Sequence, residues 1–280
     1  MKRIKINLDK RSSLSYEISM GYNILDRIGL VIAKSNLAHR YIVIADSNVS
    51  AIYGAKFLAV LRDMAINVDL IEFPAGEKSK NMDSILAIVR KLIGLGVDRS
   101  SALIALGGGV AGDMTGFIAS IYMRSIPYIQ IPTSLLAQVD SSIGGKTGID
   151  LPEGKNLLGT FFQPTMVFVD LQFLNTLPDG EFNNGLSEIV KYGIIDDIEL
   201  FNLLERETDG IRKRDPDLLG TIIGRSCKIK KGVVEDIITH RNLVGKGRPL
   251  VKVYLDSFHA GTFVSFLINF SRFLISSMRT

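Results

Sequence analysis

Short apolar runs separated by polar, turn-prone segments recur through the first 170 residues of the chain. The clearest run, residues 41–45, is rich in β-branched side chains and ends in Asp46-Ser-Asn, so it predicts a buried strand that leads into a functional loop. Residues 67–73 partly alternate between polar and apolar positions, which also indicates a strand. Further strands are predicted at residues 101–106, 128–131 and 166–170.

Helical spacing lies between these strands. In residues 81–95, four apolar positions (Ile85, Ile88, Val89 and Leu92) fall on one helical face, and residues 114–123 predict a second helix. Strands that alternate with helices are typical of a parallel, doubly wound sheet. The first part of the chain is therefore predicted to be a Rossmann-like α/β domain.

After residue 170 the pattern becomes helical. Residues 185–194, 199–207 and 218–234 all carry helical spacing, and no further strand is indicated. We place a boundary near residue 165, with an α/β domain over residues 1–165 and an all-α domain over residues 166–280.

The composition is ordinary for a globular protein, with 46% hydrophobic and 22% charged residues among 280. The net charge of +4 comes from scattered residues, and the one dense run, 212–214, suits a solvated helix end. We therefore expect no nucleic-acid partner, whereas an anionic small substrate would suit a mildly basic protein. A single cysteine, Cys227, allows no intramolecular disulfide and no Cys-based zinc site. Without a visible secretory signal or an apolar run of 18 residues, we expect a cytoplasmic protein with no membrane span.

A glycine loop follows the strand at 101–106 and opens the next helix. Gly107, Gly109 and Gly112 fit the G-x-G-x-x-G pattern, in which glycines let the backbone approach a pyrophosphate at a helix N-terminus. The motif is weak alone, since no acidic residue follows about twenty positions later to hold the ribose. Asp46, at the end of an earlier strand, is a candidate for that role, and a simple turn residue is the alternative.

Two other segments carry chemistry. Residues 131–150 crowd hydroxyls, glycines, Asp140 and Lys146 into a loop, which indicates an anion site. Lys155 and Asn156 add a cation and an amide to it. Glu188 and Lys191 share a helical face, either as a surface ion pair or, given their apolar flanks, with Glu188 as a partly buried metal ligand.

The last segment, 237–280, has one acidic residue, Asp256, against six Lys or Arg. Two interpretations stay open: an apolar helix docked on the core, or a stretch that is not native family sequence.

Taken together, these segments resemble the 3-dehydroquinate synthase family of sugar-phosphate cyclases, from about residue 10 to Glu235. The resemblance implies an NAD-binding α/β domain and a helical metal- and substrate-binding domain, with the active site between them. It also implies a homodimer, NAD, a divalent metal such as zinc or cobalt, and an anionic sugar-phosphate substrate. The family reaction converts 3-deoxy-D-arabino-heptulosonate 7-phosphate to 3-dehydroquinate and phosphate, in the shikimate pathway.

Matching of motifs, residue by residue, gives the expected site. The cofactor contacts would be Asp46, Asn48, Val49, Glu77, Lys80, Gly108, Gly109, Val110, Asp113, Thr133, Ser134, Asp140, Ser141, Lys146, Lys155, Thr176 and Leu177. The catalytic and substrate-binding residues would be Arg124, Asp140, Lys146, Lys155, Asn156, Lys191 and Lys231, with Arg124 at the phosphate. Glu188 matches the metal-ligand Glu.

The sequence departs from the family in three places. Ser125 and Ser134 are mild substitutions for Gly and Thr. After Glu235 the family's metal-binding His motif is absent, and neither His240 nor His259 has its flanking residues, while His39 lies in the first domain. The resemblance therefore implies an incomplete metal site, a reading-frame change near residue 236, and impaired activity. The alternatives are a non-catalytic NAD-binding remnant, another sugar-phosphate cyclase, or an iron-dependent alcohol dehydrogenase; residues 139–150 favour the dehydroquinate branch.

Overall fold

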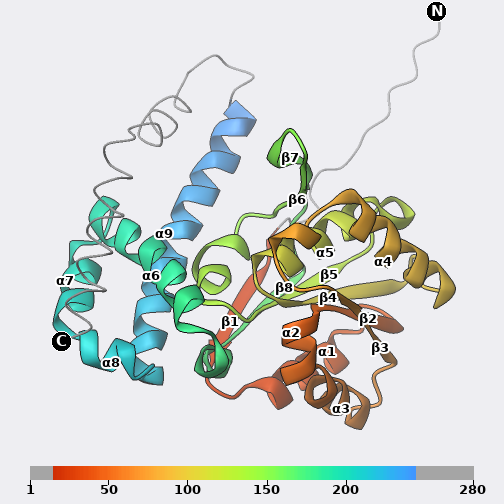
Figure 1. Cartoon of the computed structure of the whole chain (residues 1–280), viewed down its shortest axis with the longest axis horizontal. Coiled ribbons are helices and arrows are strands. Elements are labelled where there is room, and N and C mark those ends of the chain that lie inside the picture. Colours follow the sequence, from red (N-terminus) through yellow and green to blue (C-terminus); the bar gives the residue numbers. More distant parts are fainter. Residues whose placement is uncertain (1–14, 244–280) are drawn as a thin grey trace, which may run out of the picture.

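A parallel six-stranded sheet organises the first part of the molecule (Figure 1). The computed structural model describes residues 15–243, with side chains through Glu235. All neighbouring strands run parallel, in the order β1-β8-β5-β4-β2-β3. The strands are β1 Glu17–Gly21, β2 Arg40–Asp46, β3 Val68–Phe73, β4 Ser101–Gly107, β5 Tyr128–Pro132 and β8 Met166–Asp170. The predicted doubly wound α/β fold is confirmed.

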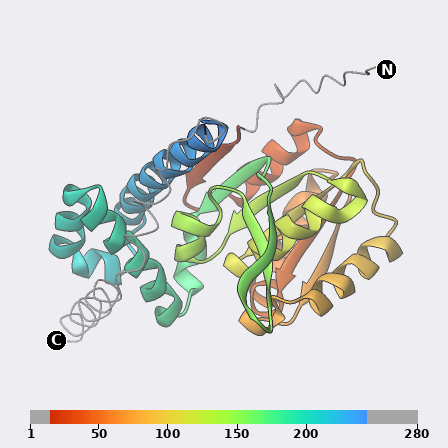
Figure 2. The same cartoon turned by 90° about the horizontal axis from the view of Figure 1, so that it is seen from above.

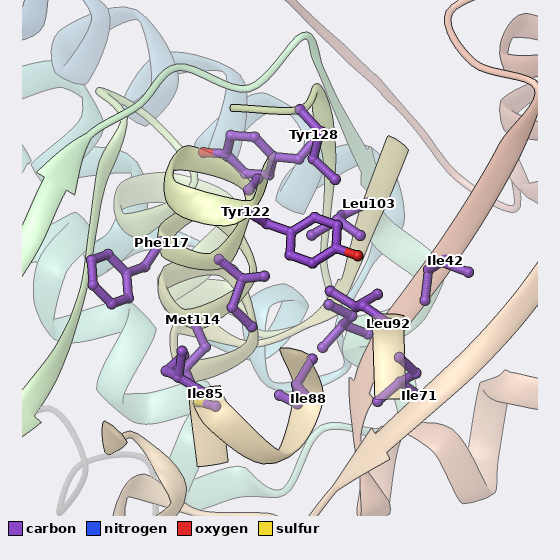
Figure 3. Close-up of a cluster of buried hydrophobic side chains, with 14 of the residues drawn as sticks. Ile42, Ile71, Ile85, Ile88, Leu92, Leu103, Met114, Phe117, Tyr122 and Tyr128 are labelled. Carbon is purple, nitrogen blue, oxygen red and sulfur yellow. The ribbon is translucent and has the colours of Figure 1, made fainter. Parts of the chain in front are cut away.

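Both faces of the sheet are covered by helices, which explains the continuous apolar runs of its central strands. One face contacts α4 (Met82–Gly94) and α5 (Gly109–Ile121), and Figure 3 shows this cluster around Ile42, Leu103 and Met114. The other face contacts α1 (Leu25–Ser35) and α3 (Ala55–Asp63). Figure 2 shows the helices on the two sides of the sheet.

The second part of the chain is helical and packs against the β8 side of the sheet, as Figures 1 and 2 show. Its long helices, α6 and α9, share a core with Leu135, Val167 and Val169. The helices are α6 Asp179–Ile195, α7 Ile198–Arg206, α8 Thr208–Arg212 and α9 Pro216–Leu243. Because β8 lies inside the sheet, the helical region begins after Asp170, and the division near residue 165 stays a prediction. Within residues 15–243, no helix combines the length and apolar character needed to cross a bilayer.

Several short elements were not predicted from the sequence. Residues 131–150, expected as a loop, form a π-helix, η4 (Ala137–Ser141), and a strand, β6 (Lys146–Leu151), that pairs with β7 (Gly154–Phe161) in an antiparallel hairpin. The remaining short turns are α2 Ser47–Val49, η1 Ser50–Gly54, η2 Glu77–Ser79, η3 Tyr122–Arg124 and η5 Leu171–Thr176. Asp140 therefore lies on η4, and Lys146 lies at the start of β6.

The hairpin depends on a close backbone approach at Gly159. A Cβ added there would lie 2.0 Å from the carbonyl oxygen of Thr147 and 2.9 Å from the Cα of Gly148. Gly159→Ala is expected to cost about 2 kcal/mol of unfolding free energy, because the strands must separate to admit the methyl group. Urea denaturation would measure it. Gly94→Ala, where an added Cβ meets nothing within 4 Å, is the control, and equal stability of the two variants would contradict the prediction.

Candidate functional site

The carboxyl ends of parallel strands meet at one edge of a sheet, and the predicted cofactor residues lie there. At the end of β2, the Asp46 side chain caps α2 by accepting hydrogen bonds from the backbone N–H groups of Asn48 (2.9 Å) and Val49 (3.1 Å). Its other carboxylate oxygen lies 3.5 Å from the position that a Cβ on Gly107 would take. Asp46, Asn48 and Val49 therefore border the glycine loop.

The glycines of the loop leave open space beside the backbone, which a larger side chain at the same position would fill. A Cβ on Gly108 would lie 3.3 Å from the Ser134 hydroxyl, and a Cβ on Gly109 would lie 3.3 Å from the Ser141 hydroxyl. Gly108 is the N-cap of α5 and supplies no capping side chain, so the first N–H groups of this 13-residue helix face the loop. Such a cradle fits a pyrophosphate.

Other residues that the sequence predicts as cofactor contacts lie beside the glycine loop. Val110 and Asp113 lie in the first turns of α5. Thr133, buried, follows β5 and donates its backbone N–H to the carbonyl of Gly107 at 2.9 Å. This bond holds the Thr133–Ser134 segment against the glycine loop.

Lys80 is the centre of a buried polar cluster. Its ammonium lies 2.6 Å from Asp113 Oδ2 and 2.6 Å from Asn156 Oδ1, and its side chain is 5% exposed. Burial raises the pKa of Asp113, although the charge of Lys80 opposes the effect. The cluster joins the turn at η2, helix α5 and the hairpin strand β7 beside the glycine loop.

A cavity of about 320 Å³ opens beside this cluster. Glu77, Lys80 and Asp150 line it, together with Lys78, Asn81, Leu151 and Pro152. The exposed ion pair between Lys155 Nζ and Glu77 Oε1, at 3.2 Å, connects the hairpin to the η2 turn. The structure thus brings Glu77, Lys80, Lys155 and Asn156 together.

Asp140 is held by the two long helices of the second part. Its Oδ1 atom accepts a hydrogen bond from the hydroxyl of Tyr192 on α6 at 2.7 Å and contacts the ammonium of Lys230 on α9. Burial alone would raise the pKa of Asp140, but the charge and hydrogen bond of Lys230 and the bond from Tyr192 hold that pKa below its ordinary value. Asp140 is therefore a carboxylate at neutral pH.

Glu188 forms an ion pair with Lys191 one turn later on α6, and both side chains are largely buried. In the part of the chain that the structure describes, no three His, Cys, Asp or Glu side chains gather to hold a metal ion. The assignment of Glu188 as a metal ligand therefore stays a prediction. His39 lies in the α/β part, where its ring contacts the carbonyl of Ser100, and the side chains of His240 and His259 are outside the described residues.

The two adjacent lysines of α9 point in different directions. Lys231, matched from the sequence, is exposed and lies 3.7 Å from Glu235, whereas Lys230 contacts Asp140. Sequence matching missed Lys230 and also Tyr192. Helical spacing could have found Lys230, because Cys227, Lys230 and Val234 fall on one face of α9 and all contact residues 138–144.

The remaining residues predicted for the site lie on several different elements. Thr176 follows β8, and its hydroxyl is 2.5 Å from the hydroxyl of Tyr53, while Leu177 packs against the helical core. Lys146 starts β6 and is exposed. Arg124, exposed, follows α5 at the end opposite the glycine loop. The 13 residues of α5 span about 20 Å, so the structure does not bring Arg124 to the site within one chain.

Cys227 gives a chemical test of how α9 docks. Its thiol is hydrogen-bonded to the carbonyl of Gln138 at 3.4 Å, and burial raises its pKa to about 11. Because the thiolate is the reactive form, we expect alkylation by iodoacetamide at pH 8 to be at least about 100-fold slower than in urea. Mass spectrometry of the modified chain would measure this. Equal rates in the folded and unfolded chain would contradict the docking of α9.

Comparison with known proteins shows which solved structures have a similar fold. Solved structures of similar architecture include a 2-epi-5-epi-valiolone synthase from Streptomyces hygroscopicus subsp. jinggangensis with NAD⁺ and Zn²⁺ bound, at a TM-score of 0.73 and 32% identity, covering 81% of this chain and 62% of that one. A 2-deoxy-scyllo-inosose synthase complexed with carbaglucose-6-phosphate, NAD⁺ and Co²⁺ has a TM-score of 0.71 and 28% identity, covering 78% and 59%. An iron-containing alcohol dehydrogenase shares the fold alone, at 18% identity and a TM-score of 0.61, covering 78% and 67%. Fold and site thus define a protein of the sugar-phosphate cyclase type.

The sequence comparisons identify the family within this type of protein. The profile for 3-dehydroquinate synthase N-terminal matches residues 70–184, and that for 3-dehydroquinate synthase C-terminal matches 185–242. The 3-dehydroquinate synthase of Thermodesulfovibrio yellowstonii is 46% identical over 234 residues, 84% of this chain and 64% of the relative, and that of Dictyoglomus thermophilum is 47% identical over 236 residues, 84% and 63%. The chain belongs to the 3-dehydroquinate synthase family. It spans under two thirds of the length of these curated relatives.

Proposed function

We propose that the chain binds NAD and 3-deoxy-D-arabino-heptulosonate 7-phosphate and takes part in the phosphate-eliminating reaction of 3-dehydroquinate synthase. One observation carries the proposal: η4 supplies residues to two neighbouring sites at once. Ser141 borders the glycine cradle, and Asp140, the preceding residue, meets the lysine-bearing helices α6 and α9. A cofactor cradle and a cationic substrate site thus adjoin.

Different residues of the site would bind different parts of the cofactor. The α5 N-terminus, with Gly108 and Gly109, would hold the pyrophosphate, and Asp46 would hold a ribose hydroxyl. Lys80, fixed by Asp113 and Asn156, would add positive charge beside the cofactor. Bound NAD supplies the hydride acceptor and donor that the reaction needs. We assign no step to a metal, because Glu188 is paired with Lys191 and the described residues complete no metal centre.

The anionic substrate would meet the ammonium groups of Lys191 and Lys230, and of Lys146 and Lys155 from the hairpin. These cations would bind and orient the sugar phosphate, and Asp140 would set the position of Lys230. One solved structure supports a sugar-phosphate ligand, since 2-deoxy-scyllo-inosose synthase was crystallised with carbaglucose-6-phosphate.

The homodimer also belongs to the proposal. If Arg124 binds the phosphate, it must do so in the site of a second chain, because it lies at the far end of α5 from its own glycine loop. Analytical ultracentrifugation would show a dimer. A monomer at all concentrations would remove Arg124 from the site.

Phosphate release from the heptulosonate substrate tests the function. Release that needs NAD⁺, measured with and without added Zn²⁺ or Co²⁺, would establish a synthase, and we expect it to be far slower than in full-length relatives. NAD⁺ binding without any release would favour the non-catalytic alternative. Absence of NAD⁺ binding would refute both.

A further inference from the structure

The hydroxyl of Tyr192 on α6 forms a long-range hydrogen bond with Asp140 on η4, next to the proposed cofactor site. Tyr192 is 5% exposed, and its hydroxyl donates to Asp140 Oδ1 at 2.7 Å across 52 residues of sequence. The contact joins α6 to the π-helix η4. A buried tyrosine hydroxyl needs such a partner, and here the partner is an ionised carboxylate, which makes the bond a strong one.

A second carboxylate competes for the same hydroxyl. Glu188, one turn earlier on α6, places a second negative charge near the Tyr192 hydroxyl, which has only one hydrogen to donate. Lys191 forms an ion pair with Glu188 and lies 5.3 Å from the centre of the Tyr192 ring. Lys191 is thus the ion-pair partner of Glu188, whereas the Tyr192 hydroxyl lies 2.7 Å from Asp140 Oδ1.

Tyr192 and Lys230 reach the same oxygen of Asp140 from different helices. Two contacts from separate elements fix the rotamer of the carboxylate, and they also hold the end of η4. Ser141, the next residue, is the side chain that faces Gly109 in the cradle. A shift of Asp140 would therefore move the wall of the cofactor site.

We propose that Tyr192 is a positioning residue for Asp140, and that through this bond helix α6 sets the shape of the cofactor site. The inference rests on the proposed NAD site. Tyr192 would act through Asp140 and would not contact the cofactor itself.

A double-mutant cycle tests it, with NAD⁺ titrated into the full chain by calorimetry. Tyr192→Phe should raise the Kd for NAD⁺ about tenfold, the size of a lost hydrogen bond to a charged group. Asp140→Asn should weaken binding to a similar extent, and the double variant should bind no more weakly than the weaker single variant, because the two residues act as one unit. Tyr122→Phe is the matched control: Tyr122 is 6% exposed and donates to the carbonyl of Val97 at 2.8 Å, away from the site.

The outcomes separate cleanly. A tenfold loss that is not increased in the double variant, with Tyr122→Phe binding like the wild type, supports the role. Multiplying effects in the double variant, or binding by Tyr192→Phe within twofold of the wild type, would overturn it. An equal loss in Tyr122→Phe would show a general packing effect and would also overturn it. A wild-type chain that binds no NAD⁺ would instead refute the proposed function, and this inference with it.

Discussion

Lys80→Met is expected to lower the free energy of unfolding by about 2–3 kcal/mol, because it leaves the Asp113 carboxylate buried without its cation. The same change should abolish measurable NAD⁺ binding, since Lys80 also holds Asn156 at the edge of the cofactor site. Methionine keeps much of the length and apolar volume of the side chain. The loss would therefore come from charge rather than from a cavity. Urea denaturation and calorimetry measure the two effects.

The stability loss should depend on pH with a defined sign. Burial raises the pKa of Asp113 in the folded chain, and removal of Lys80 takes away the main opposing influence. A carboxyl with a raised folded pKa contributes stability that is complete below its unfolded pKa and is lost as pH rises through the folded value. The deficit of Lys80→Met should therefore be larger at pH 8 than at pH 4.5. Lys80→Met combined with Asp113→Asn should remove this difference, and an equal deficit at both pH values would contradict the account.

Gly109→Val is the second change with a large expected effect. A Cβ there already lies 3.3 Å from the Ser141 hydroxyl, and the branched side chain would fill the cradle that a pyrophosphate needs. We expect the Kd for NAD⁺ to rise at least about 100-fold, through loss of the backbone contacts at the helix N-terminus.

Gly180→Val is the matched control for that change. Gly180 also lies at the start of a helix, and an added Cβ would meet nothing within 4 Å. It should bind NAD⁺ as the wild type does. Retained binding in Gly109→Val, or equal loss in both variants, would show that the cradle is not the cofactor site.

The central strands were predictable because they are buried on both faces and read as continuous apolar runs, as in β4. Strand β1 was missed for the opposite reason: it is an edge strand whose residues are mostly exposed or partly buried. The hairpin strand β7 gave no signal either, since its leucines are exposed and its Gly159 faces backbone rather than a core. The local sequence pattern reflects side-chain burial, whereas β1 and β7 are held mainly by hydrogen bonds to their neighbouring strands.

In the site, matching of local motifs named residues that the structure places close together, although their roles stay predictions. Lys80 contacts Asp113, and the glycine loop borders Ser134 and Ser141. The method failed at α9, where a shift of one residue turns a side chain by about 100° and exchanges Lys230 for Lys231. Tyr192 was missed because its importance comes from Asp140, 52 residues earlier, and no local pattern records that contact.

The most direct test of the account is a calorimetric titration of the whole chain with NAD⁺. The account predicts saturable binding of one NAD⁺ per chain, with a Kd below about 1 mM, the upper end of the range in which enzymes commonly use their substrates. Gly109→Val should remove that binding while the chain stays folded by circular dichroism. A folded wild-type chain with no saturable binding, or a Gly109→Val chain that binds as tightly as the wild type, would contradict it.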